Sequence, residues 1–210
     1  MSENEQLSES KMQQILDYTY GKVVNDVPGL KTAQQIADDY LSKPGSLESQ
    51  VNSLIAWQNT KAGTSGFVTG LGGLITMPVT IPANLASVIY VQMRMIAAIA
   101  HMGGYDLKDD RVRTMVYACL TGNAAKELLK DVGIQVGKKL AYSTINKISG
   151  ATLTKINQAV GFRLVTKFGE KGVINLGKAV PFLGGVIGAG VDATTTNTIG
   201  HVAKKVFILN

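Results

Sequence analysis

The stretch GFVTGLGGLITMPVTIPANLASVIYVQM, from Gly66 to Met93, carries no charged side chain. Its first half is rich in glycine, and its second half is apolar on almost every side. Pro82 suits the first turn of a helix, and Gly103-Gly104 suits a helix end. The pattern therefore predicts a helix of about 20 residues that ends at Met102 and is covered on all sides, by other helices or by lipid.

This helix is long enough to cross a bilayer, but it contains an arginine near its middle. Arg94 at the centre of a single lipid-facing helix would cost about 3 kcal/mol even on the most permissive insertion scale. A plain transmembrane helix is therefore disfavoured. Because a buried guanidinium needs a partner, we expect Arg94 to face an acid or helix-terminal carbonyls. Asp192 is the candidate partner, since it is the only full charge in the apolar segment 179–203.

The first third of the chain predicts three short amphipathic helices separated by two proline-glycine turns. Ser10 with Gln13 and Thr32 with Gln35 each match a capping box, and Ser46 opens the third helix. Apolar residues then recur at helical spacing and are expected to be buried. They are Met12, Ile15, Leu16, Thr19 and Val23 in the first helix, Ile36, Ala37, Tyr40 and Leu41 in the second, and Leu47, Val51, Leu54 and Ile55 in the third.

Further helices are expected after Gly104. Asp106 can cap a helix that runs to Gly122, and Asn123 can cap another that continues through its glycines toward Ser149. A basic helix is expected over about 152–168, where the helical pattern resumes. No sustained alternation of apolar and polar residues indicates a strand.

The fold class that follows is all-α, a single helical bundle domain of amphipathic helices around two glycine-rich apolar hairpin segments. Residues 1–61 are expected to pack as N-terminal helices on a domain of residues 62–210. Within that domain we distinguish an apolar hairpin (62–103), a basic helical middle (123–178) and an apolar C-terminal segment (179–207).

Charge is unevenly distributed along the chain. Residues 1–61 contain eight acids and five bases, whereas residues 123–178 contain ten bases and three acids. The basic excess favours an anionic neighbour such as phospholipid headgroups. Nucleic acid is disfavoured, because few aromatic residues accompany the bases. The polar, acidic N-terminus is not a signal peptide, so we expect a cytoplasmic location.

Two blocks of the sequence resemble a known family. GFVTGLGGLITMPVTIPANLASVIYVQMRMIAAIAHMGGYDLKD is similar to the central signature of the EcsC protein family, and VPFLGGVIGAGVDATTTNTIGHVAKKVF resembles its C-terminal segment. The matched blocks cover about 62–110 and 178–207, and Asp192 departs from the small or amide residue expected there. The resemblance implies a bacterial, mostly helical protein of the cytoplasmic membrane that supports a transporter or a secretion process, with a membrane-protein partner. It supplies no catalytic residues.

Motifs for other chemistries are weak. GVINLGKA, residues 172–179, has the glycine and lysine spacing of a phosphate-binding loop, but alanine stands at the Mg²⁺-ligand position. His101 and His201 with the single Cys119 make a poor zinc set, and Asp106, Asp109 and Asp110 suit a helix start. We therefore expect no metal, no cofactor and no nucleotide hydrolysis. Cys119 at an apolar position is expected to be a core residue.

The function that these patterns favour is non-enzymatic binding of anionic lipid at the inner face of the cytoplasmic membrane. The expected anion-binding residues are Lys138, Lys139, Lys147, Lys155, Arg163, Lys167 and Lys171. Apolar insertion or ligand contact is expected from Met77, Ile81, Leu85 and Ile89. Two alternatives stay open: a soluble helical protein that holds a lipid-like ligand in an apolar cavity, and an enzyme whose site uses Arg94, His101 and Asp192.

Overall fold

The computed structural model describes the backbone of residues 7–62, 83–134, 145–168 and 186–208, and the side chains of 7–58, 86–134, 145–168 and 194–208. The protein is all-α, as the sequence predicts. Its described elements are α1 (Glu9–Val24), α2 (Ala33–Leu41), α3 (Leu47–Ala62), α5 (Ala83–Met102), α6 (Asp110–Leu120), the short 3-10 helix η1 (Gly122–Ala124), α7 (Ala125–Asp131), α9 (Gly150–Phe168) and α11 (Val186–Phe207). An isolated bridge between Val27 and Leu30 is the nearest approach to a strand in the described part of the chain.

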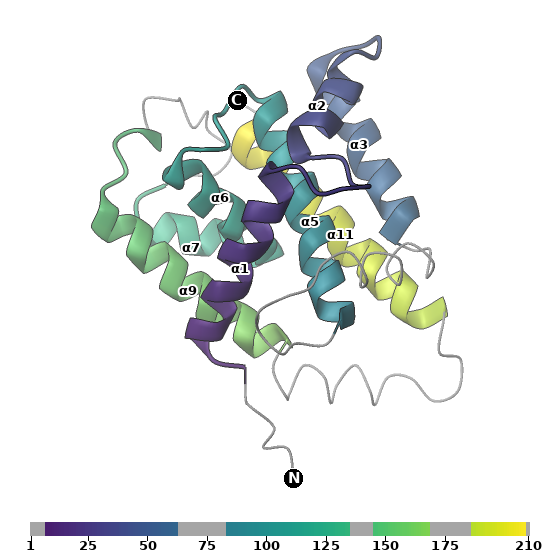
Figure 1. Cartoon of the computed structure of the whole chain (residues 1–210). Coiled ribbons are helices and arrows are strands. Elements are labelled where there is room, and N and C mark those ends of the chain that lie inside the picture. The colour runs from purple at the N-terminus through teal and green to yellow at the C-terminus, as the bar shows by residue number, and fades with distance from the viewer. Residues whose placement is uncertain (1–6, 63–82, 135–144, 169–185, 209–210) are drawn as a thin grey trace.

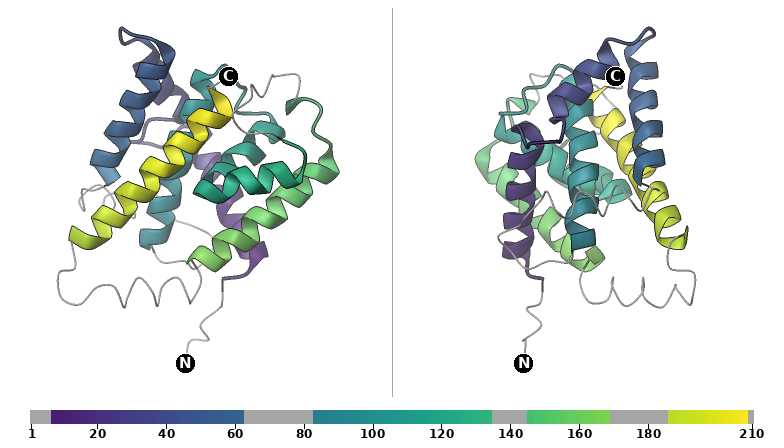
Figure 2. Two further views of the ribbon diagram at one scale, coloured as in Figure 1. Left: turned by 180° about the vertical axis from the view of Figure 1, so that it is seen from behind. Right: turned by 45° about the vertical axis from the view of Figure 1, so that its right-hand side comes forward.

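Helix α5 is the centre of the bundle. Helices α1, α2, α3, α6 and α11 pack against it, and Figures 1 and 2 show it running through the middle of the bundle between them. From Ala86 to Ala100 every side chain is buried except Val88, which is half-buried. The prediction of a helix covered on all sides is therefore confirmed, and the cover is protein. None of the described helices combines the length and the apolarity needed to cross a bilayer.

The start of α2 is capped as predicted, whereas the start of α1 is not. The Thr32 Oγ1 accepts a hydrogen bond from the Gln35 amide at 3.1 Å, and the Gln35 Oε1 accepts one from the Thr32 amide at 2.9 Å. The predicted capping box at Ser10 is wrong, because α1 begins two residues earlier. Ser8 is its N-cap, and its hydroxyl accepts a hydrogen bond from the Lys11 amide at 3.2 Å.

The start of α6 also differs from the prediction. Asp109, not Asp106, caps α6, and its carboxylate accepts a hydrogen bond from the Arg111 amide at 2.8 Å. Asp106 instead accepts one from the Lys108 amide at 2.9 Å, within the preceding turn. Both acids can cap, and the turn at 103–108 decides which of them meets the helix.

The helix expected from Asn123 toward Ser149 is interrupted within residues 123–134, the first part of it that the structure describes. Asn123 lies inside η1, and α7 ends at Asp131. Gly133 adopts a φ of 82°, and the Ile134 amide then donates to the Leu129 carbonyl at 2.8 Å. This is a left-handed glycine cap, so the glycine that was expected inside a helix ends one.

The apolar stripes of the first three helices form the core as predicted, apart from two leucines. Leu41 is 39% exposed and Leu47 is 37% exposed. Leu41 is the last residue of α2 and Leu47 the first of α3. Both flank the turn that joins these helices, where the chain leaves the surface of α5, so helical spacing alone overestimates burial at these ends.

Polar contacts within the apolar interior hold α11 in place. The Gln92 amide donates to the Thr196 hydroxyl at 3.2 Å, which joins α5 to α11. The Lys204 ammonium is almost buried and donates to Glu48 at 2.7 Å and to Asn52 at 2.9 Å, which joins α11 to α3. Gln92, Thr196 and Lys204 are all buried, so a shift of α11 along its neighbours would leave buried polar groups without these partners.

Gly200 marks the closest approach between α11 and α3. A Cβ atom at Gly200 would lie 2.9 Å from the Ile55 Cγ1 and 3.2 Å from the Met95 Cε. We expect Gly200→Ala to lower the free energy of unfolding by about 1–3 kcal/mol, because the added methyl overpacks the contact. Chemical denaturation followed by circular dichroism measures the change.

The matched control is Gly21→Ala. Gly21 also lies inside a helix, but no atom lies within 4 Å of a Cβ atom built there. Alanine should therefore raise the free energy of unfolding by about 0.5–1 kcal/mol, through helix propensity alone. Equal effects of the two substitutions would contradict the packing argument.

Candidate functional site

Three polar side chains of α5 reach three different places in the bundle. Gln92 meets Thr196 of α11, and Arg94 faces the chain just before α2. The His101 Nε2 lies 3.7 Å from a carboxylate oxygen of Asp38 on α2. At each of these three positions a neighbouring segment supplies a polar partner.

Arg94 is the most deeply placed of the described arginines. Its side chain comes from a helix that is otherwise buried, and only 5% of the residue is exposed. Its Nη1 lies 3.5 Å from the Lys31 carbonyl oxygen, and its guanidinium carbon lies 5.1 Å from the centre of the Tyr90 ring. Burial lowers the pKa of Arg94 and raises the pKa of Tyr90. Since an arginine stays protonated in proteins, the structure holds a positive charge near its interior.

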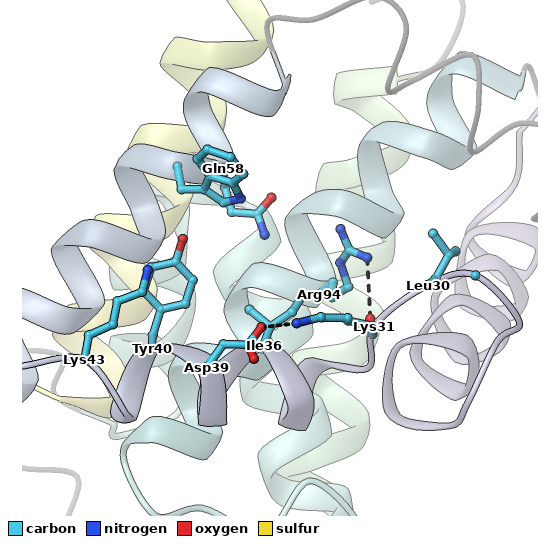
Figure 3. A pocket seen from close by; sticks show the side chains of 10 residues that line it. Leu30, Lys31, Ile36, Asp39, Tyr40, Lys43, Gln58 and Arg94 are labelled. Atoms are coloured by element: carbon cyan, nitrogen blue, oxygen red, sulfur yellow. Dashed lines mark hydrogen bonds and ion pairs between the residues drawn. The ribbon is translucent and has the colours of Figure 1, made fainter.

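An open cleft of about 610 Å³ leads from solvent to Arg94 (Figure 3). We call it the Arg94 cleft. Four charged side chains are among the described residues that line it: Lys31, Asp39, Lys43 and Arg94. The Lys31 ammonium pairs with Asp39 at 2.5 Å, and Figure 3 shows its side chain extending below Arg94 to reach that carboxylate.

The other walls of the Arg94 cleft are aromatic, apolar and amide. Tyr40 and Trp57 line it together with Leu30, Ile36 and Gln58. The Lys43 ammonium lies 3.6 Å from the centre of the Tyr40 ring, a cation–π contact. The pKa of Tyr40 is raised, first by burial and then by the neighbouring Asp39. The cleft is thus a mixed polar and aromatic site, unlike the apolar cavity considered from the sequence.

A second candidate surface is the exposed face of α9. This helix contains three bases and no acid: Lys155, Arg163 and Lys167. Phe162 is 61% exposed, and Lys155, seven residues before it, lies on the same side of the helix. Arg163 and Lys167 are half-buried beside this face. An exposed aromatic residue bordered by bases is the residue set that membrane interfaces favour.

Comparison with known proteins identifies the family. The model of the EcsC protein family matches residues 4–209, which is nearly the whole chain. The chain belongs to the EcsC protein family. The match includes the first third of the chain, which lies outside the two sequence blocks that carried the resemblance described above. No curated protein and no solved structure matches.

The structure of this EcsC-family chain describes four of the seven predicted anion-binding residues. Lys147 and Lys155 are exposed, and Arg163 and Lys167 are half-buried. All four lie in or just before α9, so they share one region of the surface. The remaining three, Lys138, Lys139 and Lys171, lie outside the described residues.

Among the four predicted apolar contact residues, the structure describes the side chain of Ile89 alone. It is 1% exposed and packs in the core of the bundle. Ile89 is therefore a core residue here, because α5 is covered on that side by its neighbours. Met77 and Ile81 lie outside the described residues, as does the side chain of Leu85.

Two residues of the predicted catalytic set, Arg94 and His101, have described side chains, and these do not meet. Arg94 and His101 are seven residues apart on α5, about 10 Å along its axis, and each faces a different partner. The side chain of Asp192, the expected partner of Arg94, lies outside the described residues, as does the GVINLGKA segment at 172–179. Arg94 meets a backbone carbonyl at Lys31, and that residue precedes a helix instead of ending one.

The acids considered for metal binding have local partners. Asp110 pairs with Arg113 at 3.0 Å, and Asp109 lies 3.6 Å from Arg111 in addition to capping α6. Among the described residues, no three histidine, cysteine, aspartate or glutamate side chains gather in a group that could hold a metal ion.

Sequence analysis missed Lys31, Lys43, Trp57 and Phe162. Lys31 and Arg94 are 63 residues apart, and no local pattern joins them. One feature of the sequence does point to the Arg94 cleft. Gln58 follows Leu54 by four residues, so an amide side chain occupies the next position of the apolar stripe of α3. Gln58 is 3% exposed, and a polar residue at a core position indicates a polar feature beside it.

The only cysteine of the chain lies in the core, as expected. Cys119 is fully buried, and burial raises the pKa of its thiol. A thiolate is the reactive form, so we expect modification by a thiol reagent at pH 8 to be at least about 100-fold slower in the native protein than in the unfolded one. A coloured disulfide reagent, with and without denaturant, measures both rates. Equal rates would show that the α6 core opens freely.

Proposed function

We propose that this EcsC-family protein is a non-enzymatic binding protein of the inner face of the cytoplasmic membrane, and that it contacts anionic lipid through α9. The observation that carries the proposal is the exposed face of α9, where Phe162 is bordered by Lys155, Arg163 and Lys167. The cytoplasmic leaflet is the anionic one, so a basic surface is attracted to it.

The sequence around α9 strengthens this attraction. No acid occurs from Val132 to Gly169, a stretch that contains six bases. Helix α1, which carries acids, packs against α9 along another edge. Glu9 lies beside Gly161 there, and a second cleft at this contact includes Asp17. The acids of α1 therefore lie on one side of α9, and the bases of α9 project from another side of it.

The expected affinity is modest. A basic residue at an anionic surface contributes about 1 kcal/mol, so the four described bases together contribute about 4 kcal/mol. Phe162 adds up to about 2 kcal/mol if it becomes fully buried in the interface. The sum of about 4–6 kcal/mol corresponds to a Kd of about 40 µM to 1 mM in accessible lipid. Such a protein binds and leaves the membrane reversibly.

A liposome flotation assay tests the proposal. We expect the protein to float with vesicles rich in anionic lipid and not with neutral vesicles. Binding should weaken as salt rises, because the Debye length falls from about 8 Å at physiological salt to about 3 Å at 1 M. Failure to float with anionic vesicles at low salt would contradict the proposal.

Two sets of substitutions locate the contact on α9. Replacing Lys155, Arg163 and Lys167 with glutamine should remove most of the salt-dependent binding. The matched control replaces Lys22, Lys108 and Lys205 with glutamine, which removes the same charge outside α9. It should bind nearly as the unmodified protein does. Equal losses in the two triple variants would show that net charge alone is responsible.

Phe162→Ser separates the apolar contribution. Because Phe162 is 61% exposed, the substitution should leave the free energy of unfolding almost unchanged. We expect it to remove the part of the binding that persists at high salt, since burial of an apolar side chain is not screened. If Phe162→Ser floats as well as the unmodified protein at every salt concentration, the aromatic side chain does not enter the interface.

A further inference from the structure

The Arg94 cleft has a different chemistry from α9 and lies on a different side of the molecule. It is formed by α2, α3, α5 and the chain before α2, whereas α9 packs on α1, α6 and α7. Figures 1 and 2 show α9 separated from α2 and α3 by the helices between them. A protein that rests on a membrane through α9 therefore keeps the Arg94 cleft available to another ligand.

Charge indicates what kind of ligand the cleft suits. Lys31, Lys43 and Arg94 provide three positive charges, and Asp39 provides one negative charge, so the described lining has a net charge of +2. This excess is local, because residues 1–61 carry eight acids against five bases. Two of those five bases line the cleft. A phosphate monoester, with a charge of about −1.5 to −2 at pH 7, matches this lining better than a carboxylate does.

The form of each cation also suits a phosphate. Arg94 presents a planar guanidinium with five N–H donors, which fits two oxygens of one phosphate. Its position is fixed, because it comes from the buried central helix and meets the Lys31 carbonyl. The two lysines are held as well: Asp39 orients Lys31, and the Tyr40 ring supports Lys43. Restraining these side chains before binding lowers the entropy that the ligand would otherwise cost.

The remaining walls suit an organic group attached to the phosphate. Trp57 is 51% exposed and lines the cleft with Tyr40, Leu30 and Ile36. Rings of this kind provide flat contact for an apolar or cyclic group. The volume of about 610 Å³ lies in the range of small-molecule sites. A space of this size is larger than a phosphate ion alone would fill.

We propose that the Arg94 cleft binds a phosphate monoester that carries a small apolar or ring-shaped group, with the phosphate on Arg94 and Lys31 and the organic group against Trp57, while Lys43 adds positive charge at the far end of the cleft. Two sources share this chemistry: a soluble organic phosphate, and the headgroup of a phosphatidic acid. The site is independent of the lipid contact proposed for α9.

The chain provides its own reporter for this site. Trp57 is the only tryptophan in the sequence, so tryptophan fluorescence reports on the cleft directly. We would titrate the full chain with phenyl phosphate, and with phenyl sulfate as a probe of similar shape and a single negative charge. We expect a saturable change with phenyl phosphate at a Kd below about 1 mM, and binding of phenyl sulfate about tenfold weaker. No saturable change up to about 10 mM phenyl phosphate, or equal affinity for both probes, would overturn the proposal.

Substitutions assign the binding to the cleft. Arg94→Met should weaken phenyl phosphate binding at least about tenfold, because a charge-assisted contact with two oxygens is lost. Since Arg94 lies in the core, a variant at exposed positions accompanies it: Lys31→Gln with Lys43→Gln should also weaken binding about tenfold. Lys108→Gln, an exposed lysine outside the cleft, is the control and should bind as the unmodified chain does. Unchanged affinity in the Lys31→Gln and Lys43→Gln double variant would place the phosphate elsewhere and overturn the proposal.

A short-chain phosphatidic acid, used below its micelle concentration, distinguishes the two sources. Tighter binding than phenyl phosphate, lost in the same double variant, identifies a lipid headgroup as the better ligand. Tighter binding of phenyl phosphate identifies a soluble organic phosphate. Either result supports a phosphate monoester site. Vesicle flotation keeps this test separate from the proposed function, because the cleft variants should still float and the α9 triple variant should still bind phenyl phosphate.

Discussion

The structure depends on the burial of α5 over nearly its whole length. An apolar helix that presents no polar face must be covered on all sides, and α1, α2, α3, α6 and α11 provide that cover. The amphipathic character of the helices around it follows from this requirement, because each buries one stripe against the centre. The close contact of Gly200 with Ile55 shows how tightly the cover is packed.

A single charge inside this apolar centre shapes the surface nearest to it. Arg94 has to meet polar groups, and the chain before α2 brings the Lys31 carbonyl to it. The same segment brings the Lys31 side chain and its partner Asp39 to the mouth of the cleft. The charged cleft is thus a consequence of placing an arginine on the central helix.

The two surfaces proposed to bind ligands are separate, and their chemistry differs. The exposed face of α9 is shallow and combines bases with an aromatic side chain, which suits a broad anionic surface. The Arg94 cleft is open to solvent but is lined by several elements, and its cations contact neighbouring groups, which suits one small anion. An EcsC-family protein built in this way could contact a membrane and hold a phosphate compound at the same time, through residues that do not overlap.

The sequence by itself determined the all-α class, the three N-terminal helices and the all-round burial of α5, because helical spacing and the absence of charge act locally or over one element. Thr32 with Gln35 is such a local signal, and it is observed as predicted. Asp106 and Asp109 could each cap α6, and the turn between α5 and α6 decides that Asp109 does so. The Arg94 cleft was decided by tertiary structure alone. Lys31, Trp57 and Arg94 come from three segments, and only the packing of α2 and α3 on α5 places them around one space.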